Sequence, residues 1–168
     1  MKWNGKAVFK RLENKLQKAR SEAPKILANA GQKVFLNNFQ TQSWNGAQWK
    51  ERKKDAGRPL LIGKTRRLRN SVANSIRFAN INRIKWATNI PYAAVHNQGL
   101  EVTRKASQKI VHFRKGKFSK AKRATSAMKL NIGGGSFKMP KRQFMGDSFI
   151  LRTELKNKMN QIFRSNLK

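Results

Sequence analysis

The chain has no cysteine, few acidic residues and no long apolar run. The absence of cysteine excludes disulfide bonds, thiolate metal sites and thiol catalysis. Lysine and arginine interrupt every apolar segment, so the sequence offers neither the apolar stretch of a signal peptide nor the roughly 20 apolar residues of a membrane span. We therefore expect a protein that does not have a membrane as its partner.

Acidic groups are scarce, which bears on catalysis. General acid–base chemistry needs two ionisable groups held together with separated pKa values. His96 lies four residues after Tyr92, on one face of a predicted short helix, but a structural role is the simpler interpretation. The glycine run at 133–135 lacks the lysine and the strand-to-helix context of a phosphate-binding loop. The seven carboxylates are scattered: Glu13, Glu22, Glu51, Asp55, Glu101, Asp147 and Glu154. We predict no enzyme activity, no cofactor and no metal site.

Basic residues, by contrast, are abundant: 39 lysines and arginines give 168 residues a formal net charge of +32. Such a charge indicates an anionic partner and says nothing about the fold. Residues 102–146 contain no acidic residue at all, and residues 50–69 are also basic. The candidate contacts to DNA or to acidic protein surfaces are Arg104, Lys105, Arg114, Lys115, Lys117, Lys120, Lys122 and Arg123.

Apolar periodicity predicts helices at both ends of the chain. One helix is expected from residue 6 to about 20 and a second from 21 to 39, with Ser21 as its cap and Pro24 in its first turn; a single kinked helix is the alternative. Asp147 or Ser148 can cap a C-terminal helix. The length fits a single domain over 1–168, in which 1–40 holds the N-terminal helices and 139–168 a turn and the last helix.

The middle of the chain alternates between turn formers and short apolar patterns. Residues 41–64 read as a loop whose Trp44 and Trp49 either plug it onto the core or anchor a partner. Residues 65–100 should contain a short helix, strands near 74–79 and 83–88, and a helix between Pro91 and Gly99. Residues 101–138 read as a basic, mobile insertion with hints of strands. The predicted fold class is α+β, with the terminal helices packed on a small antiparallel β-sheet.

Four segments, read in order, form a more specific pattern. Residues 38–49 end in Gly-Ala-Gln-Trp, residues 60–72 contain Thr-x-x-Leu-x-x-Ser, residues 90–99 contain Pro-Tyr-Ala-x-x-His-x-x-Gly, and residues 139–146 contain Pro-x-Arg-x-Phe-Met-Gly. This order resembles the virion morphogenesis or tail completion family of tailed bacteriophages, of the Mu-like type. The resemblance spans about 38 to 150. Its motif residues here are Trp49, Thr65, Leu68, Ser71, Pro91, Tyr92, His96, Gly99, Pro140, Arg142, Phe144 and Gly146.

The resemblance implies a structural protein of the virion neck or tail, present in the host cytoplasm during assembly. It implies head-tail joining or tail completion, a ring-forming homo-oligomer, and neck, tail or portal proteins as partners, with genomic DNA nearby. Three positions depart from the family pattern, since Arg66 replaces a glycine, Asn97 a glutamine and Met145 a leucine.

A sequence-independent nucleic-acid-binding protein is the alternative. Lysine and arginine neutralise phosphates, so a chain this basic should bind DNA or RNA at low salt whatever its biological task. No helix-turn-helix, zinc-finger or aromatic RNA-binding pattern is visible in the sequence. A nucleic-acid contact of this chain should therefore be made to the phosphate backbone.

Overall fold

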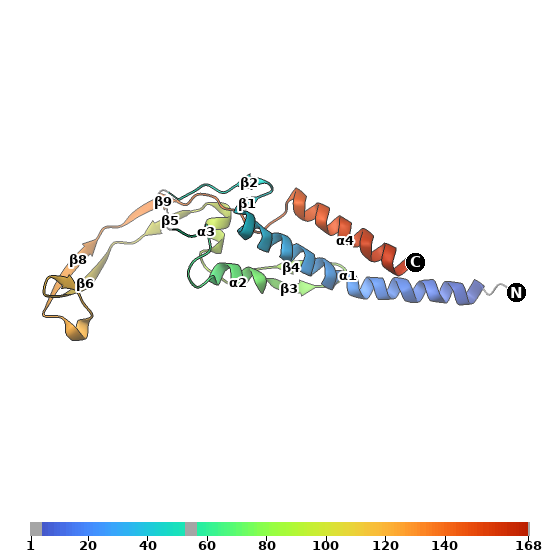
Figure 1. Ribbon diagram of the computed structural model, residues 1–168, viewed down its shortest axis with the longest axis horizontal. Coiled ribbons are helices and arrows are strands. Elements are labelled where there is room, and N and C mark those ends of the chain that lie inside the picture. Colours follow the sequence, from blue (N-terminus) through green and yellow to red (C-terminus); the bar gives the residue numbers. More distant parts are fainter. Residues whose placement is uncertain (1–4, 53–56, 168) are drawn as a thin grey trace.

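The computed structural model describes residues 5–52 and 57–167 and has the predicted α+β class. Residues 53–56, which include Asp55 of the predicted loop, lie outside the described part. Figure 1 shows an elongated molecule in which helices and short hairpins form the middle. A long β-ribbon projects from one end of it, and the N-terminal half of the first helix projects from the other.

The N-terminal segment is one helix, α1 (Gly5–Thr41), with Pro24 inside it. The prediction of two helices is therefore wrong, and the single-element alternative is right. Ser21 does not cap a second helix, since its hydroxyl donates to the Lys18 carbonyl (2.9 Å). Packing explains the continuity: Ala19 and Ala23, on the same stripe of α1, are buried with Ile162 of the C-terminal helix, so contacts before the proline support the helix there.

The C-terminal helix α4 (Phe149–Leu167) runs antiparallel to α1 along its second half (Figure 1). Ser148 caps it, as predicted, because its Oγ accepts a hydrogen bond from the Leu151 amide (3.1 Å). Asp147, the other predicted cap, forms an exposed ion pair with Arg152 instead.

Short elements lie between these helices. A hairpin of β1 (Ser43–Trp44) and β2 (Ala47–Gln48) follows α1, and α2 (Arg67–Ala73) leads to the predicted hairpin of β3 (Ile76–Ala79) and β4 (Ile84–Trp86). Helix α3 (Ala93–Gln98) ends at Gly99, whose left-handed φ of 72° fits the predicted C-cap. Arg66, at the start of α2, is also left-handed (φ 49°), a conformation that glycine adopts more readily than arginine.

One cluster of buried side chains connects these elements. It includes Trp49, and Trp44 packs against it half-buried, so both tryptophans fix the 41–64 segment to the protein's own core. The interpretation that they plug the loop onto the core is confirmed. The buried members of the cluster are Phe35, Phe39, Trp49, Leu68, Val72, Ile90, Ala93, Phe144 and Leu151.

Residues 101–138 form the projecting ribbon. Strand β5 (Glu101–Arg104) pairs with β9 (Gly135–Lys138), and β6 (Ser107–Arg114) pairs with β8 (Ser126–Ile132) and β7 (Lys117–Phe118). A 3-10 turn, η1 (Ala121–Arg123), lies at its far end. The strands hinted at in the sequence are present, and paired strands extend over most of this segment. Antiparallel pairing satisfies the backbone groups, and in β6 Lys109 and the adjacent Ile110 and Val111 interrupt the alternation of apolar residues.

Candidate functional site

Two groups of candidate residues lie in different parts of the molecule. The first is a motif cluster, which we define as Trp49, His96, Asn97, Arg142 and Phe144, where the ribbon meets the body of the protein. The second is the ribbon tip, defined as residues 114–123. Their environments differ in burial and in charge.

Arg142 connects three segments of the motif cluster. Its Nε donates to the Lys50 carbonyl (2.8 Å) and its Nη2 to the Glu51 carbonyl (3.2 Å), while its amide donates to the His96 carbonyl (2.8 Å). The residue is 7% exposed, and burial followed by the nearby charge of Arg52 lowers the pKa of its guanidinium. Its hydrogen-bond acceptors are backbone carbonyls, so the side chain organises the chain rather than holding a ligand.

Asn97 fixes the turn that carries Phe144. Its Oδ1 accepts hydrogen bonds from the amides of Phe144 (2.9 Å) and Met145 (3.1 Å), and its Nδ2 donates to the Met145 carbonyl (2.9 Å). The Phe144 ring, 1% exposed, then packs on Phe39 at a centroid distance of 5.3 Å. These bonds join α3 to the segment that precedes α4.

Trp49 and Asn38 complete the same turn from the other side. The Trp49 Nε1 donates to the Gln143 carbonyl (2.8 Å), and its ring meets Phe39 edge to face at 5.8 Å. Asn38 is buried and its Nδ2 donates to the Phe144 carbonyl (3.2 Å). The backbone of residues 142–145 is therefore held by side chains from α1, the tryptophan segment and α3.

His96 is the one titratable group of the cluster whose state depends on pH near neutrality. Burial, and then the charge of Arg142, lower its pKa from the usual 6.5, so the imidazole is neutral at pH 7. Its ring meets Tyr92 edge to face at 6.0 Å, and its Nδ1 is buried without a hydrogen-bond partner among the described residues. The described residues bring no group of three metal-ligating side chains together, here or elsewhere.

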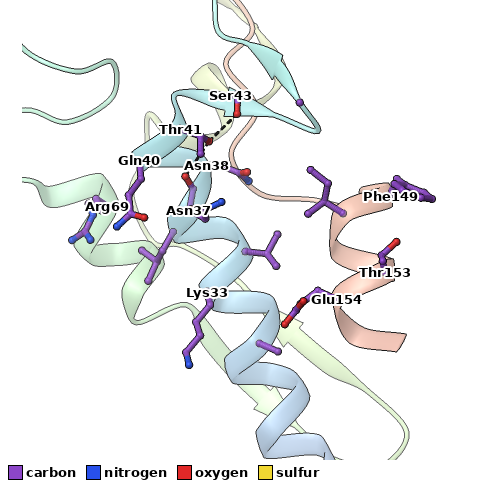
Figure 2. A pocket seen from close by; sticks show the side chains of 15 residues that line it. Lys33, Asn37, Asn38, Gln40, Thr41, Ser43, Arg69, Phe149, Thr153 and Glu154 are labelled. Atoms are coloured by element: carbon purple, nitrogen blue, oxygen red, sulfur yellow. Dashed lines mark hydrogen bonds between the residues drawn. The ribbon is translucent and has the colours of Figure 1, made fainter. Parts of the chain in front are cut away.

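An open groove of about 870 Å³ lies between the C-terminal part of α1 and the start of α4. Figure 2 shows Lys33, Asn37 and Asn38 on α1, with Thr153 and Glu154 on α4 across from them. The described residues of its wall include one carboxylate and no histidine, so the groove assembles no acid–base pair.

The ribbon has two chemically different faces, because directly paired residues of antiparallel strands share a face. Val111 pairs with Met128 and Phe113 with Phe118 on one face, which is mostly apolar. Ile110 pairs with Lys129 and Arg114 with Lys117 on the other, which is mixed and basic. Phe118 and Met128 are 82% and 52% exposed, so the apolar face is largely uncovered in this chain.

The ribbon tip gathers most of the predicted basic contacts. Lys115 (φ 49°) and Gly116 (φ 71°) form the two-residue turn between β6 and β7, a geometry that favours glycine at the second position. Arg104 ends β5 and Lys105 lies between β5 and β6, nearer the body. All eight predicted contacts are exposed, and six lie in the tip: Arg114, Lys115, Lys117, Lys120, Lys122 and Arg123.

The remaining motif residues are spread over the body. Leu68 is buried in the core, and the Ser71 hydroxyl is hydrogen-bonded to the Thr88 hydroxyl. Pro140 is half-buried, while Thr65, Pro91, Tyr92 and Gly146 are exposed. A Cβ on Gly99 would lie 2.9 Å from the Lys141 Cβ, so this glycine permits close approach of α3 and the 139–146 segment. The structure thus brings the end of the 90–99 segment close to the 139–146 segment, while Thr65 and Pro91 stay exposed.

Two side chains that hold the motif cluster together were not predicted to do so. The residue types alone give no sign that Asn38 and Asn97 bond to the 142–145 backbone, and only the hydrogen bonds of the folded chain show it. Both lie within segments of the motif pattern, 38–49 and 90–99, and this was the available signal. Gly31, within α1, leaves room for the Trp86 ring against the helix.

Comparisons with protein-family models, curated proteins and solved structures yield no match for this chain. None of the helices in the described ranges is long and apolar enough to cross a membrane.

Proposed function

We propose that this chain is a structural protein of a tailed-bacteriophage virion. It acts at the neck or the head-proximal end of the tail, where it completes the tail or joins it to the head. It works there as a ring-forming homo-oligomer beside the DNA passage, with neighbouring neck, tail or portal proteins as partners, and without catalysis. The ordered motif resemblance and the basic, projecting ribbon support this proposal.

The observation that carries the proposal is the use of the motif residues as structural links. Trp49 and Asn97 direct their polar atoms at backbone groups of the 139–146 segment, and Arg142 directs its guanidinium at the carbonyls of Lys50 and Glu51, which directly follow Trp49. A motif that builds a scaffold in this way is what a virion building block requires. The ribbon, which projects from that scaffold, then supplies a surface free to contact a neighbour or DNA.

The assembly state provides the first test. Native mass spectrometry and negative-stain imaging of the purified chain, alone and with candidate neck or tail partners, should show closed rings or incorporation into particles. Rings use heterologous interfaces, in which two different patches of the same chain meet. A chain that stays monomeric alone and with every such partner contradicts the proposal.

The position near DNA is tested by charge. Neutralising the eight predicted ribbon cations to glutamine should leave particle assembly intact and impair DNA retention or ejection. A matched control neutralises eight cations on the helices: Lys6, Lys10, Arg11, Lys15, Lys18, Lys156, Lys158 and Arg164. Normal DNA handling by the ribbon variant would remove DNA from the list of partners and leave acidic protein surfaces.

One observation favours the second candidate, a sequence-independent nucleic-acid-binding protein. The six tip cations are exposed, and the one ion pair found in the described ranges, Arg152 with Asp147, lies far from them in the chain. A dedicated binder should keep measurable affinity for duplex DNA near physiological salt, whereas incidental binding should vanish there. Salt-dependent binding by a chain that enters no particle favours this candidate.

A further inference from the structure

The most exposed large apolar side chain of the described residues lies within the most basic segment. Phe118 is 82% exposed and sits in the ribbon tip, with Lys117 before it and Lys120 shortly after. An exposed aromatic ring costs free energy in water unless something covers it. The charged residues around the Phe118 ring therefore indicate which kind of partner could cover the ring.

The ring of Phe118 is held in place rather than free to fold back. It pairs with Phe113 across β6 and β7 and stacks on that ring at a centroid distance of 5.2 Å and an angle of 30°. The rest of the tip is tied to β6, since the Ser119 amide donates to the His112 carbonyl (2.9 Å) and the Thr125 amide to the Phe113 carbonyl (2.8 Å). One face of a preorganised aromatic pair is thus presented outward.

Charge around this ring points to an anion. Arg114 and Lys117 stand directly opposite each other across the turn, a like-charge pair that destabilises a hairpin. Lys115, between them in the turn, adds a third charge. A phosphate placed among these groups removes the repulsion, and the acid-free sequence around them offers no carboxylate that could do so.

We propose that the ribbon tip is a nucleic-acid-binding site in which Phe118 contacts bases while the surrounding cations hold the phosphate backbone. Stacked aromatic rings bind unpaired bases without sequence preference, and apolar wedges inserted between base pairs serve the same purpose in duplexes. The shared chemistry is a base π-face beside a phosphate. The inference rests on the DNA contact proposed above and adds to it the residue that distinguishes nucleic acid from a plain polyanion.

The test measures binding of the full chain to three probes. These are a short labelled duplex, a single strand of the same sequence, and inorganic polyphosphate as a competitor without bases. The variants are Phe118→Ala, the double variant Lys115→Gln/Lys117→Gln, and Phe149→Ala as a matched control, since Phe149 is 74% exposed but lies outside the tip. Binding is followed over roughly 50–200 mM salt.

Phe118→Ala should weaken binding to the preferred DNA probe about tenfold, in the range found when a base-stacking aromatic is removed. The slope of log affinity against log salt should not change, because the ring neutralises no phosphate, and competition by polyphosphate should not change either. The lysine double variant should reduce the slope by roughly 1.8 for the duplex or 1.4 for the single strand. Phe149→Ala should behave as the wild type.

A further variant, Phe118→Leu, separates the two sources of bases. Leucine can act as a wedge in a duplex but cannot stack on an unpaired base. If Phe118 inserts into duplexes, Phe118→Leu should keep the affinity for the duplex; if Phe118 stacks on unpaired bases, the variant should lose affinity for the single strand.

Several results would overturn the inference. Unchanged DNA affinity in Phe118→Ala, or an equal loss for DNA and polyphosphate, shows that the ring contacts no base. Unchanged DNA affinity together with reduced self-association in both Phe118→Ala and Met128→Ala assigns the ring to the apolar face as a protein contact. An unchanged salt slope in the lysine double variant shows that Lys115 and Lys117 hold no phosphate, which overturns the cation part of the inference. Failure of the proposed function is measured separately, by a chain that stays monomeric and enters no particle.

Discussion

Arginine serves opposite purposes in the motif cluster and in the ribbon tip. Arg142 is buried and its guanidinium donates hydrogen bonds to backbone carbonyls of its own chain, whereas Arg114 is exposed and faces Lys117 across a turn. Both contribute equally to the net charge of +32. The comparison teaches that composition alone cannot separate a cation that builds the fold from one that is available to a partner.

The comparison also predicts how each region responds to mutation. Substitutions in the motif cluster should act on the free energy of unfolding, while substitutions in the ribbon tip should act on binding and leave stability nearly unchanged.

The largest effect is expected for Phe144→Ala. The ring is 1% exposed and packs against Phe39, so its removal leaves a cavity and should lower the free energy of unfolding by about 3–5 kcal/mol. Phe118→Ala, in the tip, should change it by less than about 0.5 kcal/mol. Urea denaturation of both variants measures the difference, and equal losses would mean that the tip is as integral to the fold as the core.

A smaller loss is expected for Asn97→Ala. The substitution removes three hydrogen bonds and leaves the amides of Phe144 and Met145 without their acceptor, which should destabilise the protein by about 2 kcal/mol. The adjacent exposed Gln98→Ala is the control and should lie within about 0.5 kcal/mol of the wild type. Similar denaturation midpoints for the two variants would contradict the structural role given to Asn97.

Gly31→Ala should destabilise the protein although alanine is the better helix former. In an open helix this change gains about 1 kcal/mol. Here the new Cβ would lie 2.5 Å from the Trp86 Cζ2, and such overpacking costs about 1–3 kcal/mol, for a net loss of up to about 2 kcal/mol. The ribbon offers the control, since a Cβ on Gly133 meets nothing within 4 Å. Stabilisation by Gly31→Ala would show that Trp86 is not seated against α1.

The smallest effect concerns pH. Burial and Arg142 lower the pKa of His96 in the folded protein. Below pH 6.5, the usual pKa of histidine and the value expected in the unfolded chain, the unfolded chain therefore binds a proton at His96 more readily than the folded protein does. Stability should therefore be fully present above pH 6.5 and should fall as the pH drops from there towards the folded-state pKa. His96→Gln should flatten this part of the curve of unfolding free energy against pH. An equally steep curve in the variant would assign the pH dependence to other groups.

Much of the body could be predicted from the sequence because its signals are local. The Ser148 cap, the β3–β4 hairpin and the Gly99 end of α3 each depend on a few neighbouring residues. The continuity of α1 could not be predicted in this way. Proline is a strong local signal for a helix start, but Ile162, far away in sequence, packs on Ala19 and Ala23 and overrides it.

The ribbon and the motif cluster show the same limit in two forms. In the ribbon, Lys109 and the adjacent Ile110 and Val111 interrupt the strand period of β6, and only the pairing partner fixes which residues share a face. In the cluster, the sequence identified Trp49, Arg142 and Phe144, but the acceptors and donors they meet are mostly backbone groups, which no motif records. Asn97 was noted as a departure, while its three hydrogen bonds follow from the fold alone.

The long helix α1 has a mechanical consequence. At 37 residues it is about 55 Å long, and Pro24 removes one donor from its middle, so a bending load should make it yield there first. The C-terminal helix packs beside that point through Ile162 and acts as a brace. If α4 is displaced, for example by a neighbouring subunit, α1 loses this support at Pro24 and should bend there, and the reach of its projecting N-terminal part changes with it.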